Sequence, residues 1–311
     1  MTAAPAGPAG PGGAASPGGP GGRLFTDEEL AAVGRSPWRA AADAVRQGRY
    51  DDARVLVART EDNCRAQMDR YNGWLGSIAL AAAERWGQAG GTMLAVATRR
   101  FFAASPDLAA TGADDPPPLV ELAVVELERW LERWRRTIDF HRDWISALLS
   151  AVYRTHGVDA LEAVLRTCGA QGLMGSVEAF NRRDARDRLV SFVALLHGHF
   201  TELDVTEDDR KFVIAQDPCG TCSRQVLDGR YGPPVDLAVV EERHPATWGR
   251  GTTTIYRSHV PVWHVEMARE HFGVPWPVNQ CPHGVDGGPC RILLYKDPYD
   301  PEANDQVPGG A

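Results

Sequence analysis

The chain has 311 residues, a formal net charge of −8, 43% hydrophobic residues and 24% charged residues. These proportions are typical of a folded globular protein, and the length allows one large core or two ordinary ones. The acidic balance and the lack of a clustered basic stripe argue against nucleic acid as a partner.

No apolar run approaches the roughly 20 residues that cross a bilayer, and the N-terminus lacks the charged and apolar blocks of a secretory signal. We therefore expect a cytoplasmic protein with no membrane partner. In that compartment its cysteines are expected to be reduced thiols or metal ligands rather than disulfides. The heavy use of Ala, Arg, Gly and Pro points to a GC-rich bacterial genome.

Residues 1–22 consist almost wholly of Ala, Gly, Pro and Ser. Such side chains bury too little apolar surface to offset the entropy lost on ordering, so this segment is predicted to be a disordered tail. A flexible tail is also predicted over residues 301–311.

Residues 23–187 show helical patterning and form the first predicted domain. Ser36 followed by Pro37 is a typical helix start, with a capping side chain and a proline in the first turn. The segment 48–53 is predicted to be a turn between two helices.

An internal echo runs through this helical domain at a constant offset. Four residues recur in order: Arg65, Asp69, Trp74 and Gly87 match Arg135, Asp139, Trp144 and Gly157. Each copy is predicted to be an amphipathic helix ended by a glycine in a left-handed cap, and the prolines at 116–118 separate the copies. The sequence thus predicts a helical repeat, with units over about 37–113 and 114–187, whose surface could form a homodimer face.

Residues 188–300 differ in character and form the second predicted domain. A helix is expected over 188–200, and another over 262–272 that crosses a small sheet. Four short runs have strand-like composition, separated by turn clusters of Gly, Pro and Asp: 203–205, 211–215, 252–256 and 291–295. The predicted fold class is α+β, with an all-helical duplicated region followed by a smaller Cys/His-rich α+β domain.

The sharpest chemical motif is the segment 218–222, with the letters PCGTC. In a C-x-x-C turn both sulfurs, here Cys219 and Cys222, can reach one tetrahedral ion at about 2.3 Å. Cys281 and Cys290 form a second cluster around a loop rich in Gly and Pro. Two such turns far apart in sequence are typical of a zinc ion that staples a small sheet, and iron also suits thiolate and imidazole ligands.

A dithiol redox centre is an alternative for the same motif, because C-x-x-C can lower the pKa of its first thiol. The C-x-x-C motif of such a centre normally lies at the N-terminus of a helix that follows a strand. Asp228 and Gly229 follow so soon that no helix is expected here. Unliganded thiols are a third alternative.

His264 and Glu266 give H-x-E, which together with P-C-x-x-C reproduces the two halves of the zinc deaminase signature. The halves stand in reverse order, so we consider only a convergent site, with His264 as a ligand and Glu266 as a proton shuttle. The alternative is that the two side chains point apart on a helix, one packed and the other solvated.

Other histidines compete for a role at this site. His259 precedes the predicted helix and could contact metal or substrate, and the remaining candidates are His197, His199 and His271. His141 and Asp139 are expected to pack rather than to act in catalysis, because the first repeat has Tyr71 at the position of His141. Cys64 and Cys168 have no second cysteine or histidine at a spacing typical of metal sites. We expect both to be small buried hydrophobic side chains.

Several features of the C-terminal third follow one known pattern. They are Cys281 and Cys290 around a Gly-rich loop, the strand 291–296, and Tyr256 and His259 before a helix ending at Phe272. In these features the region 189–297 resembles the superfamily of 4-vinyl-reductase-like domains and 2-amino-thiazoline-4-carboxylate hydrolase-like proteins. The resemblance implies a small-molecule pocket, a cysteine-held metal in some members and, in one branch, hydrolysis of a C–N or C–S ring bond. It carries over Cys281, Cys290 and His259, and it does not cover the C-x-x-C motif.

Two main functions remain open from the sequence. The first is a zinc-dependent hydrolase of a small molecule, with an open metal site, Glu266 as proton shuttle and His259 as a substrate or metal contact. The second is a small-molecule-binding or regulatory module in which zinc is structural. Three protein ligands would favour the enzyme, whereas closure by four cysteines would favour the module. The four are Cys219, Cys222, Cys281 and Cys290.

Overall fold

The computed structural model describes residues 22–105, 124–281 and 285–307. Within these ranges no helix is both long and apolar enough to cross a membrane. The predicted N-terminal tail lies, apart from Gly22, outside the described residues, as does the proline segment expected to separate the repeats.

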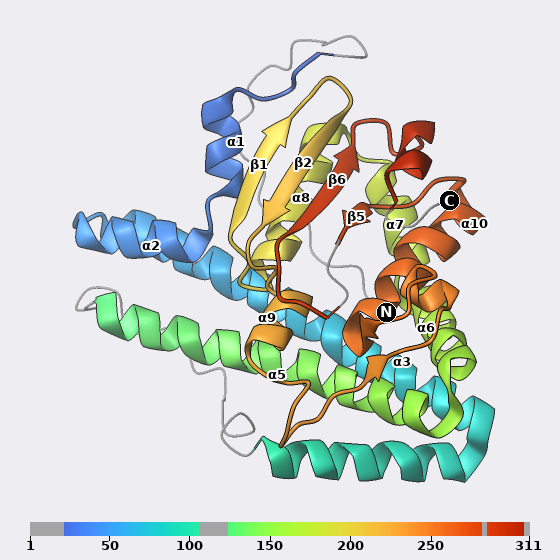
Figure 1. The fold of residues 1–311 in the computed structure, drawn as a ribbon. Helices are drawn as coiled ribbons and strands as arrows, with labels where there is room; N and C mark the ends of the chain where they lie inside the picture. The colour runs from blue at the N-terminus through green and yellow to red at the C-terminus, as the bar shows by residue number, and fades with distance from the viewer. Residues whose placement is uncertain (1–21, 106–123, 282–284, 308–311) are drawn as a thin grey trace.

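The first part of the chain is helical (Figure 1). Its helices are α1 (Asp27–Gly34), α2 (Pro37–Arg46), α3 (Tyr50–Ala104), α5 (Val124–His156), α6 (Val158–Gly172), α7 (Met174–Asn181) and α8 (Ala185–His197). Pro37 opens α2 as predicted, but the Ser36 side chain does not cap it. Its hydroxyl instead lies 3.4 Å from Glu202 Oε1.

Two glycines break the long helices where the repeat pattern placed them. Gly87 has φ of 56° and ψ of −136°, so the run labelled α3 is two helices that meet at this residue (Figure 1). Gly157, with φ of 82°, separates α5 from α6. Both φ angles are positive, and residues with a Cβ avoid that region of backbone conformation. This explains why glycine stands at these two positions. The duplication itself stays a prediction.

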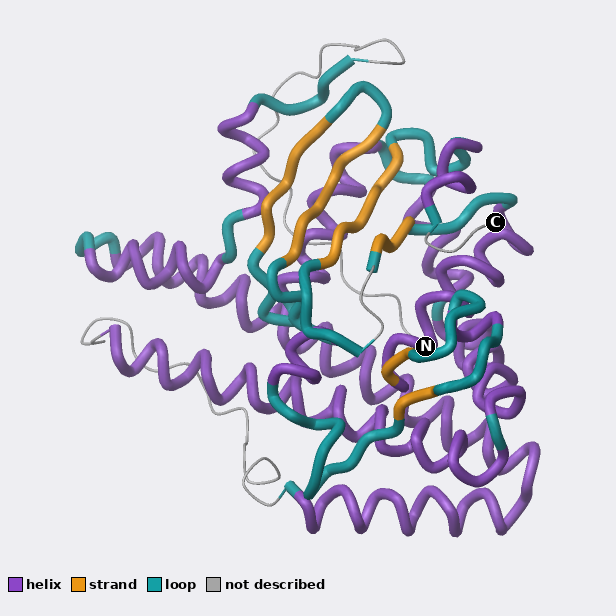
Figure 2. The backbone as a smooth tube through the Cα atoms, viewed as in Figure 1, coloured by secondary structure: helices purple, strands orange, loops and turns teal. Residues whose placement is uncertain are grey.

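The second part of the chain contains the strands. The main sheet has the order β1-β2-β6-β5 and is antiparallel throughout. Its strands are β1 (Leu203–Glu207), β2 (Lys211–Gln216), β5 (Val278–Gln280) and β6 (Cys290–Tyr295). A separate pair joins β3 (Val239–Val240) to β4 (Thr253–Thr254), away from the main sheet (Figure 2). The α+β class is therefore confirmed, with most of the chain helical.

Short helical segments complete this part: α9 (Cys222–Leu227), η1 (Pro245–Thr247), η2 (Ile255–Ser258), η3 (Val260–Met267), α10 (Ala268–Phe272) and η4 (Pro301–Gln306). The predicted strand over 252–256 is only β4, because the chain then turns into the 3-10 helix η2. The predicted helix over 262–272 exists, but its first half is the π-helix η3.

The predicted flexible tail is ordered over Pro301–Gln306. Asp300 caps this 3-10 helix by accepting a hydrogen bond from the Glu302 amide at 3.0 Å. Arg210, at the turn between β1 and β2, forms ion pairs with both acids. Ala303 is buried against the sheet. The capping and the ion pairs explain why these residues do not behave as a free tail.

The main sheet packs one face on α8. Alternate residues of β2 and β6, Phe212, Ile214, Ile292 and Leu294, form a cluster with the apolar face of α8. The long helices α3 and α5 lie below the sheet in Figure 1. Their core includes residues from both predicted domains, among them Leu75 and Leu149 from the helices and Tyr256 and Val262 from the later part. The site described next lies between these layers.

Candidate metal centre

The sheet register brings the four candidate cysteines together. Gln216, the last residue of β2, pairs with Cys290, the first residue of β6. The C-x-x-C turn therefore leaves the sheet beside Cys290, and Cys281 directly follows the neighbouring strand β5. Cys219, Cys281 and Cys290 form one buried cluster. This convergence of two cysteine pairs was predicted from the sequence.

The thiols of this cluster interact with one another. Hydrogen bonds from the thiols of Cys222 and Cys290 and from Thr221 lower the pKa of Cys219 well below its usual value. The same interaction raises the pKa of Cys222, which donates its proton toward Cys219. Hydrogen bonds with Cys219 and Cys281 raise the pKa of Cys290. Cys219 therefore ionises before Cys222 and Cys290.

A buried arginine adds a positive charge to the cluster. Arg257, in η2, is 0% exposed, and its charge interacts with all four cysteines. Its Nη2 also donates to the carbonyl oxygen of Asp286 at 3.1 Å. A fixed guanidinium charge in a buried site favours thiolate over thiol, and thiolate is the form that binds metals.

The donors are present without a preformed coordination geometry. Among the described residues, no group of three or more His, Cys, Asp or Glu side chains is placed to hold a metal ion. Burial, soft sulfur donors and a neighbouring cation are the chemistry that suits zinc. The residues therefore fit the ion by chemical type.

The C-x-x-C turn is fixed by close packing at Gly220. A Cβ at this position would lie 2.2 Å from Thr201 Oγ1 and 2.5 Å from the carbonyl oxygen of His199, so only glycine fits. The Gly220 amide uses this proximity to donate to Thr201 Oγ1 at 3.1 Å. The Thr221 hydroxyl lies 3.1 Å from Cys219 Sγ. The close approach explains the glycine of the motif.

Residues of α5 hold the turn from the other side. Arg142 Nη1 lies 3.4 Å from the carbonyl oxygens of Gly220 and of Thr221. Arg224, in α9, donates from Nη2 to Asp139 Oδ1 at 2.7 Å. Asp139 is therefore part of the support of this site, in line with the predicted packing role. His141 hydrogen-bonds through Nδ1 to the Thr137 carbonyl of its own helix.

Two candidate histidines, His259 and His264, are oriented by the backbone, and the ring of His259 interacts electrostatically with Cys219. Their Nδ1 atoms donate to the carbonyl oxygens of Tyr256 and Trp276 respectively. Because a carbonyl oxygen only accepts, each neutral ring keeps Nε2 as an acceptor. Burial lowers the pKa of His259 to about 3 and that of His264 to about 4. Both rings are therefore neutral at pH 7.

His199 and His197 occupy different surroundings. His199 Nδ1 lies 3.0 Å from the hydroxyl of Tyr71, and burial lowers its pKa to about 3. The Tyr71 hydroxyl lies 3.4 Å from that of Tyr256, which continues the polar chain toward η2. His197 instead hydrogen-bonds through Nε2 to the Gly34 carbonyl. His199 thus belongs to the surroundings of the cysteine site, and His197 anchors α1.

Glu266 is placed on η3, two residues after His264. In the described part of the chain, no hydrogen bond, ion pair or ring contact joins Glu266 to the cysteines. A catalytic role for this carboxylate stays a prediction. Sequence reasoning did not single out Arg142, Arg224 or Arg257. The one available signal was an Arg142–Asp143 pair directly before the mainly apolar run 144–149.

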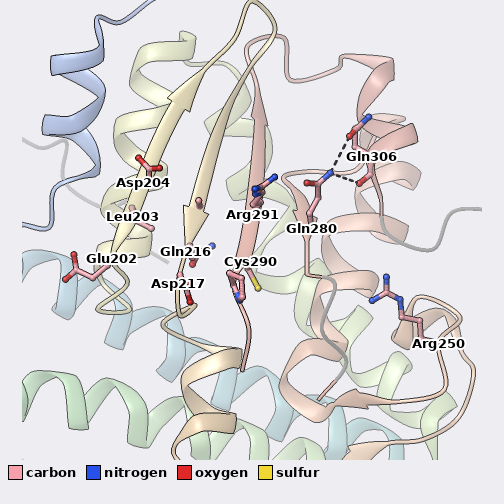
Figure 3. A pocket seen from close by; sticks show the side chains of 12 residues that line it. Glu202, Leu203, Asp204, Gln216, Asp217, Arg250, Gln280, Cys290, Arg291 and Gln306 are labelled. Carbon is pink, nitrogen blue, oxygen red and sulfur yellow. Dashed lines mark hydrogen bonds between the residues drawn. The ribbon is translucent and has the colours of Figure 1, made fainter. Parts of the chain in front are cut away.

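A pocket of about 890 Å³ opens at the end of the main sheet beside the cysteine cluster (Figure 3). Its floor is a single cross-strand row of Asp204, Ala215, Arg291 and Gln280. Gln280 Nε2 donates to Gln306 Oε1 at 3.3 Å on the far side. Cys290 lines this pocket and also belongs to the cluster, so the two features share a wall.

No family model, curated protein or solved structure matches this chain. The resemblance to 4-vinyl-reductase-like domains therefore stays an expectation from the sequence.

Proposed function

We propose that the protein is a small-molecule-binding module built around a closed four-cysteine site for zinc. The observation that carries this proposal is that Cys219, Cys281 and Cys290, from segments about sixty residues apart, form one buried cluster, to which Cys222 is linked by a hydrogen bond with Cys219. Four thiolates complete the tetrahedral shell that structural zinc prefers, and such an ion contributes directly to folding free energy. Arg257 supports the proposal because its charge offsets part of the negative charge of four thiolates.

The ligand of the module is proposed to occupy the pocket on the sheet. Arg291 stands in the middle of the floor, and its cross-strand neighbours are Ala215 and Gln280 rather than carboxylates. The small Ala215 leaves room between Arg291 and Asp204. A polar small molecule that fills this space would also lie against the wall that carries Cys290.

The hydrolase remains the alternative for this site. It requires an open metal position and an unligated carboxylate nearby that shuttles protons, which is the role expected for Glu266. Nδ1 of His264 is engaged with the Trp276 carbonyl, so only Nε2 of that ring could serve as a ligand. The closed site is favoured because four thiols already lie together.

The dithiol alternative is supported by one observation. Cys222 begins α9, a short helix that follows strand β2, although the sequence had predicted no helix here. This is the strand-to-helix setting in which C-x-x-C dithiols are found. The helix forms because the side chains of Arg224 and Gln225 are held by α5.

Elemental analysis of the full chain, purified under reducing conditions, tests the metal proposal. We expect about one zinc per chain, lost in both Cys219→Ser and Cys281→Ser because each removes one of four thiolates. His264→Ala and Glu266→Gln are expected to keep the metal. Cys64→Ala is the matched control, because that buried thiol lies in the helical core away from the cluster.

The outcomes separate the three functions. Zinc that is lost in His264→Ala as well would reject closure by cysteines and favour the open, hydrolytic site. Wild-type protein without metal would overturn the zinc proposal. In that case a Cys219–Cys222 disulfide formed by mild oxidation, and detected by mass spectrometry, would establish the dithiol function.

Filling the pocket tests the ligand proposal. Compounds from a metabolite panel that raise the Tm of the wild-type protein by about 2 °C or more are expected to lose this effect in Ala215→Phe, whose ring would occupy the floor. A Val190→Phe variant serves as the control, because Val190 is an exposed position on α8. Hits that stabilise Ala215→Phe as well as wild type would place the ligand elsewhere.

A further inference from the structure

We propose that Arg142 is a positioning residue of the four-cysteine site, which holds the C-x-x-C turn in the geometry that binds metal. The inference rests on the proposed zinc function and assigns a task to the helical layer. Arg142 lies on α5, outside the predicted cysteine-rich domain, and is 0% exposed.

The contacts of Arg142 fall on the two residues between the paired cysteines. Its Nη1 approaches the carbonyl oxygens of Gly220 and Thr221 at 3.4 Å each. Cys219 precedes these residues and Cys222 follows them, so fixing both peptide groups fixes the separation and direction of the two Cβ atoms. The hydrogen bonds are long, but they come from a charged donor that cannot move away.

Two carboxylates of the same helix hold the guanidinium in place. Nη1 of Arg142 donates to Asp139 Oδ1 at 2.8 Å. Nε and Nη2 donate to Asp143 Oδ1 at 2.9 and 2.7 Å. Both carboxylates are buried, so solvent does not compete for these bonds. The orientation of Arg142 is therefore set before any metal binds.

A second arginine ties the turn to the same helix. Arg224 contacts Asp139 through Nη2 at 2.7 Å, and the same nitrogen donates to the His199 carbonyl at 2.7 Å. Its Nη1 donates to the Phe200 carbonyl at 3.1 Å. Arg224, on the helix that begins at Cys222, is thus bonded both to the segment before β1 and to Asp139, which Arg142 also contacts.

The geometry of arginine is essential to this arrangement. A guanidinium offers five N–H donors in a rigid fork and can bridge two carboxylates and two carbonyl groups at once. Lysine keeps the charge but has a single point of contact, so it cannot fill all four places. If Arg142 served only to neutralise the charges of Asp139 and Asp143, its contacts with the carbonyl groups of Gly220 and Thr221 would not be needed.

The test compares metal affinity in Arg142→Lys and Arg230→Lys, using full-length protein. Arg230 also pairs with Asp143, at 3.0 Å, but sits at the end of the segment after α9 and is the matched control. Zn²⁺ affinity is measured by competition with a chromophoric chelator. We expect about a 10- to 100-fold loss in Arg142→Lys, the range seen when groups that orient metal ligands are removed, and wild-type affinity in Arg230→Lys.

A Co²⁺ absorption spectrum gives the readout that a general loss of stability would not move. Displacement of the turn should change the d–d bands of the Co²⁺ protein in Arg142→Lys and leave them unchanged in Arg230→Lys. If Arg142→Lys does not fold, the isosteric Asp139→Asn variant, which loosens the same guanidinium, is measured instead. Wild-type affinity and spectrum in whichever variant folds would overturn the inference. Absence of metal binding by the wild-type protein would instead reject the proposed function and this inference with it.

Discussion

Replacing Asp143 by alanine is expected to lower the free energy of unfolding by about 3–5 kcal/mol, the cost of removing one partner from a buried ion pair. Asp143 is fully buried, accepts two hydrogen bonds from Arg142 and pairs with Arg230. Its Oδ1 also accepts from Gln225 Nε2 at 2.9 Å. Without this carboxylate, Asp139 is the one carboxylate left that accepts a hydrogen bond from Arg142 among the described residues, and Gln225 loses one of its contacts to α5.

Urea denaturation of the variant at pH 7 measures this loss. Glu178→Ala is the control, because Glu178 on α7 pairs with Arg182 on the surface, where both side chains are more than half exposed. An exposed ion pair of this kind contributes about 1 kcal/mol or less. Equal losses in the two variants would show that Asp143 does not anchor the buried network.

Acidification from pH 7 to pH 5 is expected to destabilise the protein through its buried histidines. Burial lowers the pKa of His197 to about 4 and that of His199 to about 3. In the unfolded chain a histidine titrates near 6.5 and therefore takes up a proton at pH 5 that the folded state excludes. Each buried neutral histidine therefore makes its full contribution to the free energy of unfolding above about pH 6.5. This contribution is lost as the pH falls towards the pKa of the folded state, and the loss reaches about 2 kcal/mol per histidine by pH 5.

The measurement is the difference in unfolding free energy between pH 7 and pH 5 for wild type and His199→Gln. The variant has one less buried titrating group, so its difference should be smaller by about 2 kcal/mol. His271→Gln is the control, because His271 is exposed on α10. His259 and His264 act in the same direction as His199, so some acid sensitivity will remain. A pH dependence unchanged in His199→Gln would contradict the expectation.

The cysteine cluster could be predicted because its signal is local. C-x-x-C after a strand and Cys290 at the start of another strand are both visible in a single sequence, and antiparallel pairing of β2 with β6 brings them together. The helical first part was likewise visible from its periodicity and from the glycines that end its helices. The cysteine pairs and the helix-ending glycines are thus local signals, whereas the convergence of the cysteines depends on strand pairing between distant segments.

The supporting arginines could not be predicted in the same way. Arg142 is one of many arginines on helices, and its burial depends on contacts with residues 78 and 79 positions later in the sequence. Helical periodicity places such a residue on a face but does not say which segment covers that face. Tertiary packing, rather than local preference, decides whether its charge is solvated or buried.

The relative orientation of His264 and Glu266 could not be predicted from their spacing, because the helix that carries them is irregular. Both residues lie in η3, a π-helix, where the turn is wider than in an α-helix. Predictions of which side chains share a face assume 3.6 residues per turn and do not transfer to such a segment. The π-helix is rare enough that no sequence pattern would have been read as one.

The core shared by the two parts of the chain also determines how the protein must fold. The Tyr71 and Tyr256 hydroxyls lie 3.4 Å apart but are separated by 185 positions. At the usual speed of synthesis, about 5–20 residues per second, α3 leaves the ribosome roughly 10 to 40 s before its partner exists. During that interval α3 can pack against α2, α5, α6 and α8, which are all made before η2. The helices can therefore form early, but the nascent chain acquires its final packing only after η2 and η3 have been made.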